Sequence, residues 1–135
     1  MKRHIYISGI IVLILGIFFV GSTNGKTKTP GGSGVLSVSD IQADPSAFKG
    51  TITIIGVVAA VFKEDPKLFA IIDTKEAKLC KSTGCAKFYL PVQYERQIPN
   101  LWDEVNVTGN FEGGDPNFRA INVDVLRHLT FGDKQ

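Results

Sequence analysis

Thr51-Ile52-Thr53-Ile54-Ile55-Gly56-Val57-Val58 is the stretch of sequence that decides the fold. Threonine and isoleucine alternate in its first half, and β-branched residues dominate throughout, as is typical of strands. The pattern predicts one long strand, opened by a turn at Lys49-Gly50. Gly56 within it predicts a bulge or a sharp bend, which would let one strand pair in both halves of a barrel.

Four further segments have strand-like patterns, and a short helix is expected ahead of the first strand. The helix should be capped by Ser37 or Ser39, run through Ala43 and end at Asp44-Pro45. The later strands are predicted at residues 68–73, 87–93, 104–111 and 118–126. Five short strands led by a long bent one predict an all-β fold, a five-stranded barrel of the oligonucleotide/oligosaccharide-binding (OB) type. An immunoglobulin-like sandwich usually needs about seven strands.

A hydrophobic segment lies at the N-terminus. Residues 5–20 form an uncharged apolar run that follows Lys2, Arg3 and His4. A transmembrane helix needs roughly 20 apolar residues, with about 17 as the lower limit, so this run is either a signal-peptide core or a short membrane-anchor helix. Positive charge before the run keeps the N-terminus in the cytoplasm and sends the remainder outward.

The chain is accordingly divided into four parts. Residues 1–22 are predicted to be a signal anchor or signal peptide, and 23–35 a flexible linker rich in Gly, Ser and Thr. Residues 36–130 form the OB-type domain, and 131–135 form a tail. The expected location is the inner membrane, crossed once, with the C-terminal domain in the periplasm or outside the cell. Export makes nucleic acid an improbable partner, and so does the net charge of +2.

Cys80 and Cys85 are the two cysteines of the chain. In an oxidising compartment a local pair is most simply a disulfide, with metal binding, redox activity and free thiols as alternatives. The spacing is not Cys-x-x-Cys, and no second Cys or His cluster completes a zinc site, so no metal site is predicted. The surrounding lysines could attract an acidic ligand or a membrane headgroup, although a solvated loop is the simpler interpretation. They are Lys75, Lys78, Lys81 and Lys87.

His128 follows the last predicted strand and is the candidate for a ligand or a covalent attachment point, with a plain surface histidine as the alternative. For catalysis the sequence offers little. Asp103 and Glu104 are neighbours in sequence, and adjacent side chains of a strand point to opposite faces, so they make a poor acid–base pair. No nucleophile elbow, phosphate loop or metal triad is present. The sequence therefore predicts no catalytic residue and no enzyme.

The second half of the chain resembles the periplasmic haem chaperone of cytochrome c maturation, the E component of that system. The matching segments are 91–94, 98–102, 105–109, 118–120 and 125–128. The resemblance implies an N-terminal membrane anchor followed by an OB-type barrel. It also implies haem as the cofactor, held by a histidine after the last strand, which is His128 here.

These features lead to one functional expectation and two alternatives. The expectation is a membrane-anchored, exported OB-type binding module without catalysis, whose partner is a protein or a small ligand of unknown identity. The first alternative is a haem-binding chaperone that uses His128. The second is a thiol-redox or metal-binding protein that uses Cys80 and Cys85.

Overall fold

Strand β2 (Gly50–Val61) organises the computed structural model, which describes residues 34–111 and 117–131. Its first part pairs antiparallel with β5 (Asp103–Phe111), and its last part pairs antiparallel with β3 (Leu68–Ile72). The two pairings meet at Val57, which is in register with both neighbours. The prediction that one long strand serves both halves of a barrel is confirmed.

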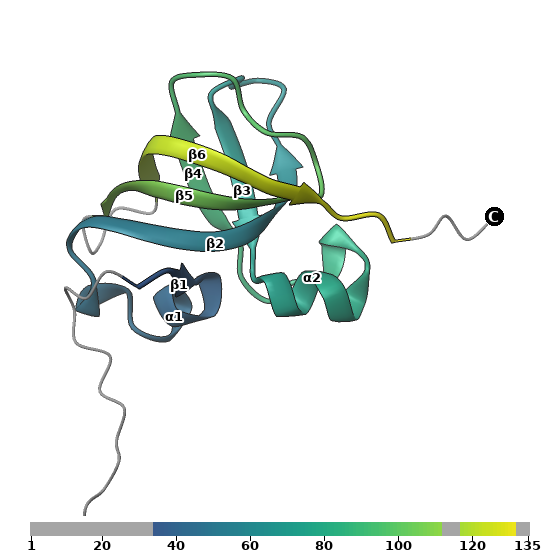
Figure 1. Cartoon of the computed structure of the whole chain (residues 1–135), viewed down its shortest axis with the longest axis horizontal. Coiled ribbons are helices and arrows are strands. Elements are labelled where there is room, and N and C mark those ends of the chain that lie inside the picture. The colour runs from purple at the N-terminus through teal and green to yellow at the C-terminus, as the bar shows by residue number, and fades with distance from the viewer. Residues whose placement is uncertain (1–33, 112–116, 132–135) are drawn as a thin grey trace, which may run out of the picture.

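The remaining strands complete a closed, mostly β barrel of five strands (Figure 1). Strand β4 (Leu90–Tyr94) is antiparallel to β3 and parallel to β6 (Phe118–His128), which returns antiparallel to β5. The order around the barrel is β2-β3-β4-β6-β5, and the pairing of β2 with β5 closes it. This topology is compatible with the predicted OB-type fold. A two-residue strand, β1 (Leu36–Ser37), adds to β2 in parallel.

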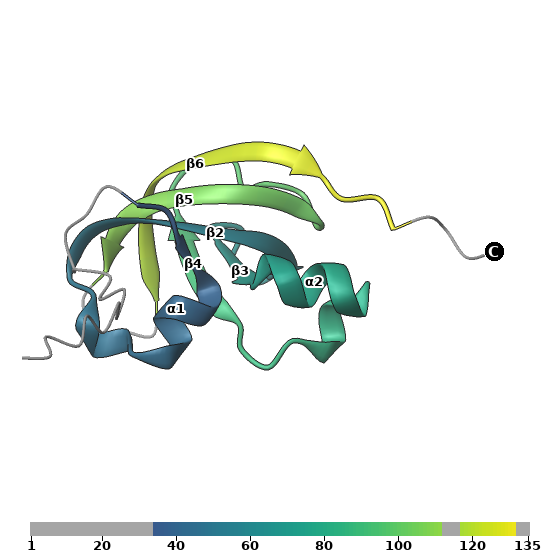
Figure 2. The same ribbon diagram turned by 60° about the horizontal axis from the view of Figure 1, so that its bottom comes forward.

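Two short helices lie on the same side of the barrel (Figure 2). Helix α1 (Val38–Ala43) begins at a Ser37 capping box and is followed by a 3-10 turn at Pro45–Ala47. Its predicted position is confirmed. Helix α2 (Thr74–Cys80) and the 3-10 turn Thr83–Cys85 occupy the connection between β3 and β4, for which the sequence predicted only a loop.

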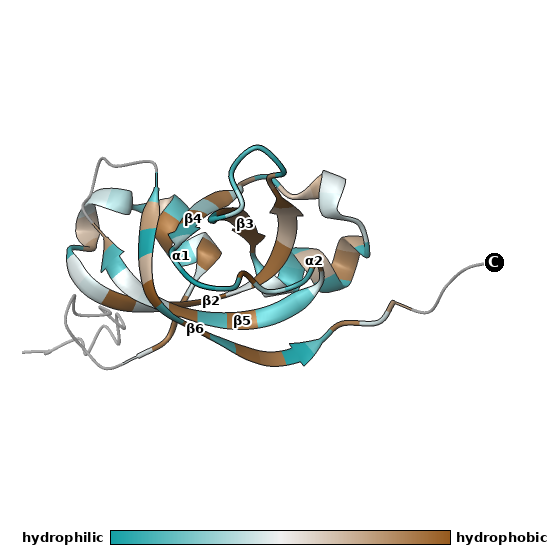
Figure 3. Cartoon of the chain, turned by 90° about the horizontal axis from the view of Figure 1, so that it is seen from above, coloured by the Kyte–Doolittle hydropathy of each residue, from teal (hydrophilic) through white to brown (hydrophobic). Residues whose placement is uncertain are grey.

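The apolar side chains form two clusters. The larger cluster fills the barrel and includes Val38 and Ile41 of α1, so that α1 covers one end of the interior. The smaller cluster lies on the outside, where Ala77 of α2 packs against β2 and β3. Figure 3 shows the apolar stretches of β2 and β3 that contribute to both. The members of the barrel cluster include Ile54, Phe69, Leu90, Val92, Val107, Phe111 and Phe118.

The boundaries of β4 and β6 differ from the predicted ones. The third strand begins at Leu90 rather than residue 87, because Leu90 pairs with Ile71 and β3 ends at the next residue, Ile72. The Tyr89 hydroxyl donates a hydrogen bond to the Thr83 carbonyl oxygen of the 3-10 turn. The last strand extends to His128, so this residue lies within β6 and not after it.

For Gly56 the sequence predicts a bulge or a sharp bend, and the bulge lies elsewhere in β2. Gly56 pairs in register with Val105, and the irregularity of β2 lies between Val58 and Ala60. Glycine is needed here for close approach instead, since a Cβ atom at this position would lie 2.9 Å from the Ile72 carbonyl oxygen.

Several predictions concern residues outside the described ranges. The signal anchor at 1–22 lies there, as do most of the 23–35 linker and most of the 131–135 tail. Among the residues that the structure describes, no helix has the length and apolar character needed to cross a membrane.

Gly109 marks the closest approach of β5 and β6. It pairs with Ala120, and a Cβ atom here would collide with the backbone carbonyl of Arg119. We therefore expect Gly109→Ala to lower the free energy of unfolding by about 2–3 kcal/mol, because neither strand can move without disturbing the barrel. Urea denaturation measures this.

Gly84→Ala is the matched control. A Cβ atom at Gly84 meets nothing nearer than the Ser82 Oγ atom at 3.8 Å, so its free energy of unfolding should change by less than about 1 kcal/mol. Equal effects of the two substitutions would contradict the proposed tight approach at Gly109.

Candidate functional site at the end of strand β6

His128 is held by a buried carboxylate. Asp103 opens β5 after a tight turn, in which Trp102 adopts a positive φ of 70°. One Asp103 oxygen accepts the Asn100 backbone N–H at 2.8 Å, and the other lies 2.8 Å from His128 Nδ1. Asp103 is buried, whereas the His128 side chain is 53% exposed. When Nδ1 carries the proton it donates to Asp103, and this leaves Nε2 as the ring nitrogen within reach of a ligand.

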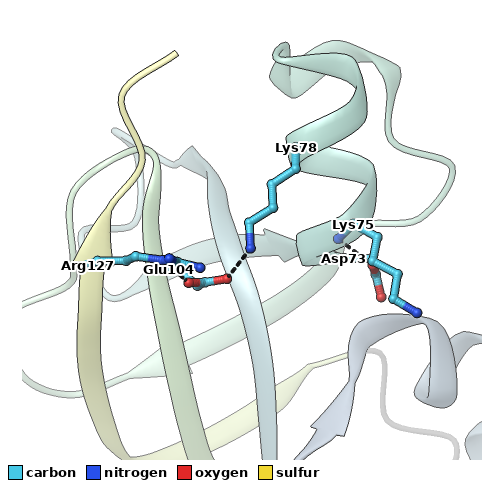
Figure 4. Close-up of polar contacts among 5 residues, drawn as sticks. All are labelled: Asp73, Lys75, Lys78, Glu104 and Arg127. Carbon is cyan, nitrogen blue, oxygen red and sulfur yellow. Dashed lines mark hydrogen bonds and ion pairs between the residues drawn. The ribbon is translucent and has the colours of Figure 1, made fainter. Parts of the chain in front are cut away.

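Glu104 forms a second charged centre on the outer face of the barrel (Figure 4). Its carboxylate lies 2.5 Å from Arg127 Nε of β6 and 3.3 Å from Lys78 Nζ of α2. The Glu104 side chain is 5% exposed, while both basic side chains reach it from the surface. Three elements, β5, β6 and α2, are therefore joined through one buried carboxylate.

The pKa of Glu104 is set by two opposing effects. Burial alone raises this pKa, because it disfavours the charged carboxylate. The hydrogen bonds and positive charges of Arg127 and Lys78 lower it and outweigh burial, so the net shift is downward from the ordinary value of 4.5. Glu104 is therefore ionised throughout the neutral range and forms ion pairs with Arg127 and Lys78.

Asp73 joins the two helices. It caps α2 by accepting the Lys75 backbone N–H at 2.8 Å (Figure 4), and it accepts the hydroxyl of Ser39 in α1 at 2.6 Å. Burial raises the pKa of Asp73, and the hydrogen bonds from Ser39, Lys75 and Glu76 together lower it below the ordinary value of 3.8. The Asp73 carboxylate therefore has a structural role, because it joins α1 to α2.

The cysteine pair closes the segment after α2. The sulfur atoms of Cys80 and Cys85 lie at disulfide distance, with their Cα atoms 6.4 Å apart. The prediction of a Cys80–Cys85 pair is confirmed. The metal or redox role stays a prediction. Within residues 34–111 and 117–131, no three His, Cys, Asp or Glu side chains are gathered closely enough to hold a metal ion.

A further feature of this end of the barrel is the second half of β6. Strand β4 pairs with β6 only from Phe118 to Ala120, so among the described residues the stretch 121–128 has β5 as its partner on one side and none on the other. We call this stretch the open β6 segment. It exposes three large apolar side chains, namely Ile121 at 55%, Val125 at 53% and Leu126 at 48%.

The structure thus relates the sequence-predicted residues to others that the sequence did not single out. His128 ends the open β6 segment, whereas Cys80 ends α2 and Cys85 ends the 3-10 turn after it, so the two predicted sites lie on different elements. The sequence predicts that Asp103 and Glu104 point to opposite faces and make a poor acid–base pair, and in the structure each binds a different residue of β6. The buried position of both at the start of a strand was not visible in the sequence pattern.

The charged centre at Glu104 predicts a pH dependence of stability. Its pKa is lower in the folded chain than in the unfolded chain, so the stabilisation is complete above about pH 4.5 and is lost as the pH falls through the folded-state value. We expect Glu104→Gln to lower the free energy of unfolding by about 1–3 kcal/mol at neutral pH and to flatten its decline toward acid pH. Urea denaturation across this pH range measures both effects.

Glu95→Gln provides the control, because Glu95 and its partner Lys67 are both exposed. The free energy of unfolding of Glu95→Gln should equal that of the natural chain within measurement error, because exposed ion pairs contribute little to stability. An unchanged acid decline in Glu104→Gln would show that Arg127 and Lys78 do not stabilise the charged carboxylate.

Comparison of the chain with protein-family models, with curated proteins and with solved structures found no match. The resemblance to the haem chaperone therefore has no family match behind it, and what the structure supports of it is a closed five-stranded barrel.

Proposed function

We propose that this chain is an exported OB-type binding module, tethered to the inner membrane by its N-terminal segment, that binds an extended segment of a partner protein and performs no catalysis. The observation that carries the proposal is the open β6 segment. It combines exposed apolar side chains with one strand edge that no described strand covers. Such an edge can accept a further strand through its backbone groups, while the side chains select the sequence.

The charged residues near this surface support binding in preference to chemistry. Asp103 accepts the Asn100 backbone N–H in the turn before β5 and contacts the His128 ring. Glu104 forms ion pairs with Arg127 and Lys78. Each buried carboxylate is thus engaged by donors that fix the fold. The bulges of β6, where the register shifts near Ile121 and Leu126, turn these two side chains toward solvent. A partner can reach them without any change in the barrel.

Site-specific photocrosslinking in the cells that make the protein tests the proposal. A photoreactive residue replaces Val125 in the full chain. We expect one adduct, identified by mass spectrometry as a defined segment of one protein. Ile121→Lys combined with Leu126→Lys should reduce the adduct at least about tenfold, because two bulged apolar contacts become charged.

Phe62→Lys is the control, since Phe62 is an exposed apolar residue between β2 and β3 and not on β6. It should leave the adduct unchanged. The absence of an adduct, or equal losses in the double variant and the control, would rule out the open β6 segment as the binding surface. Turnover that depends on a defined side chain of the purified protein would overturn the non-catalytic part.

Haem binding is the second candidate function, and the contact between His128 and Asp103 favours it. A carboxylate that holds one ring nitrogen orients the other toward a metal, and it makes that nitrogen a better ligand. The exposed Val125 on the same strand offers an apolar surface beside the ring. On this proposal Nε2 of His128 would bind the haem iron.

A haem titration of the full chain distinguishes this candidate. We expect a Soret shift with the natural chain, loss of the shift with His128→Ala, and its retention with His4→Ala, which removes the other histidine of the chain. Identical spectra for the natural chain and His128→Ala would exclude His128 as the ligand.

A further inference from the structure

Helix α2 and the disulfide-closed segment after it form an exposed basic projection. We call residues 74–87 the lysine tip. At the centre of this stretch lies Leu79, whose exposed fraction of 83% is the highest among the exposed large apolar residues of the described chain. Four lysines surround it in sequence, namely Lys75, Lys78, Lys81 and Lys87. An apolar side chain so fully in water is the kind of feature that marks an interaction site when charges of one sign surround it.

Charge is distributed unevenly between the tip and the remainder of the domain. The described residues contain ten Lys and Arg and ten Asp and Glu, which gives a net charge of zero. The tip contains four lysines and one acidic residue, Glu76, so it carries +3 and the remainder carries −3. The Lys78 side chain forms an ion pair with Glu104. The side chains of Lys75, Lys81 and Lys87 make no ion pair with any described residue, so their charge is available outward.

Local interactions keep the tip in shape. A helix of seven residues is not stable alone. Here Asp73 caps its first turn, and the Lys81 backbone N–H bonds to the Ala77 carbonyl oxygen at its end. The Cys80–Cys85 disulfide ties the following segment back to the helix, and Ala77 is buried against the barrel. These contacts fix the helix that carries the exposed Leu79 (Figure 2 shows α2 beside the barrel).

We propose that the lysine tip rests on the anionic surface of a lipid bilayer, with Leu79 at the boundary between the headgroups and the acyl chains and Lys75, Lys81 and Lys87 against lipid phosphates. An apolar side chain flanked by lysines matches both layers of that interface, because the lysine stems reach phosphate depth while leucine enters the acyl boundary. The opposite charge of the remaining domain turns the tip, and not another face, toward an anionic surface. The proposal goes beyond partner binding at β6 and does not depend on it.

Tryptophan quenching in vesicles tests the proposal on the full chain. Leu79→Trp places a reporter at the apex, and the same chain without this substitution gives the background from Trp102, the natural tryptophan. Both chains are incorporated into vesicles with brominated acyl chains, made of phosphatidylcholine alone or with about 30% phosphatidylglycerol. We expect strong quenching of the reporter with phosphatidylglycerol and at least about threefold less without it.

Two matched double variants, each made in the Leu79→Trp chain, separate the tip from overall charge. Lys75→Gln with Lys81→Gln should lower the apparent affinity for the anionic vesicles by about tenfold or more, and Lys49→Gln with Lys63→Gln should not. All four lysines are exposed. High salt should weaken the quenching, since surface charges are screened.

The outcomes are distinct. Quenching that is absent with phosphatidylglycerol overturns the proposal and favours a soluble acidic partner for the lysines. Quenching that is equal in both lipids, or equal in the two double variants, overturns it as well. Vesicle flotation reports separately on the N-terminal tether, because a tethered chain floats with pure phosphatidylcholine whatever happens at the tip.

Discussion

Strand β2 hydrogen-bonds to β5 with its first part and to β3 with its last, and this double pairing closes the barrel. A strand that serves two halves of a sheet has to pass close to its neighbours, and Gly56 permits this beside Ile72 and Val38. Closure gathers the apolar side chains into one interior, which α1 covers from one end. Polar and charged groups are then confined to the rim and the outer face, where both proposed binding surfaces lie.

Three buried acidic residues show how the rim is built. Asp73 joins α1 to α2, Asp103 joins the turn before β5 to the end of β6, and Glu104 joins α2 to β6 across β5. Burying a carboxylate is costly unless donors surround it, and each of these three has at least two. The same bonds that satisfy the charges fix the positions of His128 and of the lysine tip.

Much of the barrel could be predicted from the sequence, because β-branched alternation marks β2, β5 and β6 directly. Helix α2 was missed because it is short and lies beside a cysteine pair that suggested a loop. A signal was present nonetheless: Asp73 is followed three positions later by Glu76, a spacing typical of a helix start.

The charged centre at Glu104 could not be predicted in this way. Its partners Lys78 and Arg127 are each more than twenty residues away in sequence, and only strand register and helix packing bring them together. A single sequence shows the local pattern of a strand, but it does not show which remote side chain will lie opposite.

Glu104 also fixes the two proposed surfaces relative to each other. Lys78 belongs to the lysine tip and Arg127 to the open β6 segment, and both bind the same buried carboxylate. Separating them would leave that carboxylate buried with fewer donors, which is strongly disfavoured, so tip and strand move as one unit. A domain resting on a bilayer through the tip would therefore hold the open β6 segment at a fixed angle to the membrane. A partner segment would then be bound beside the membrane surface in one orientation, which a flexible linker alone cannot achieve.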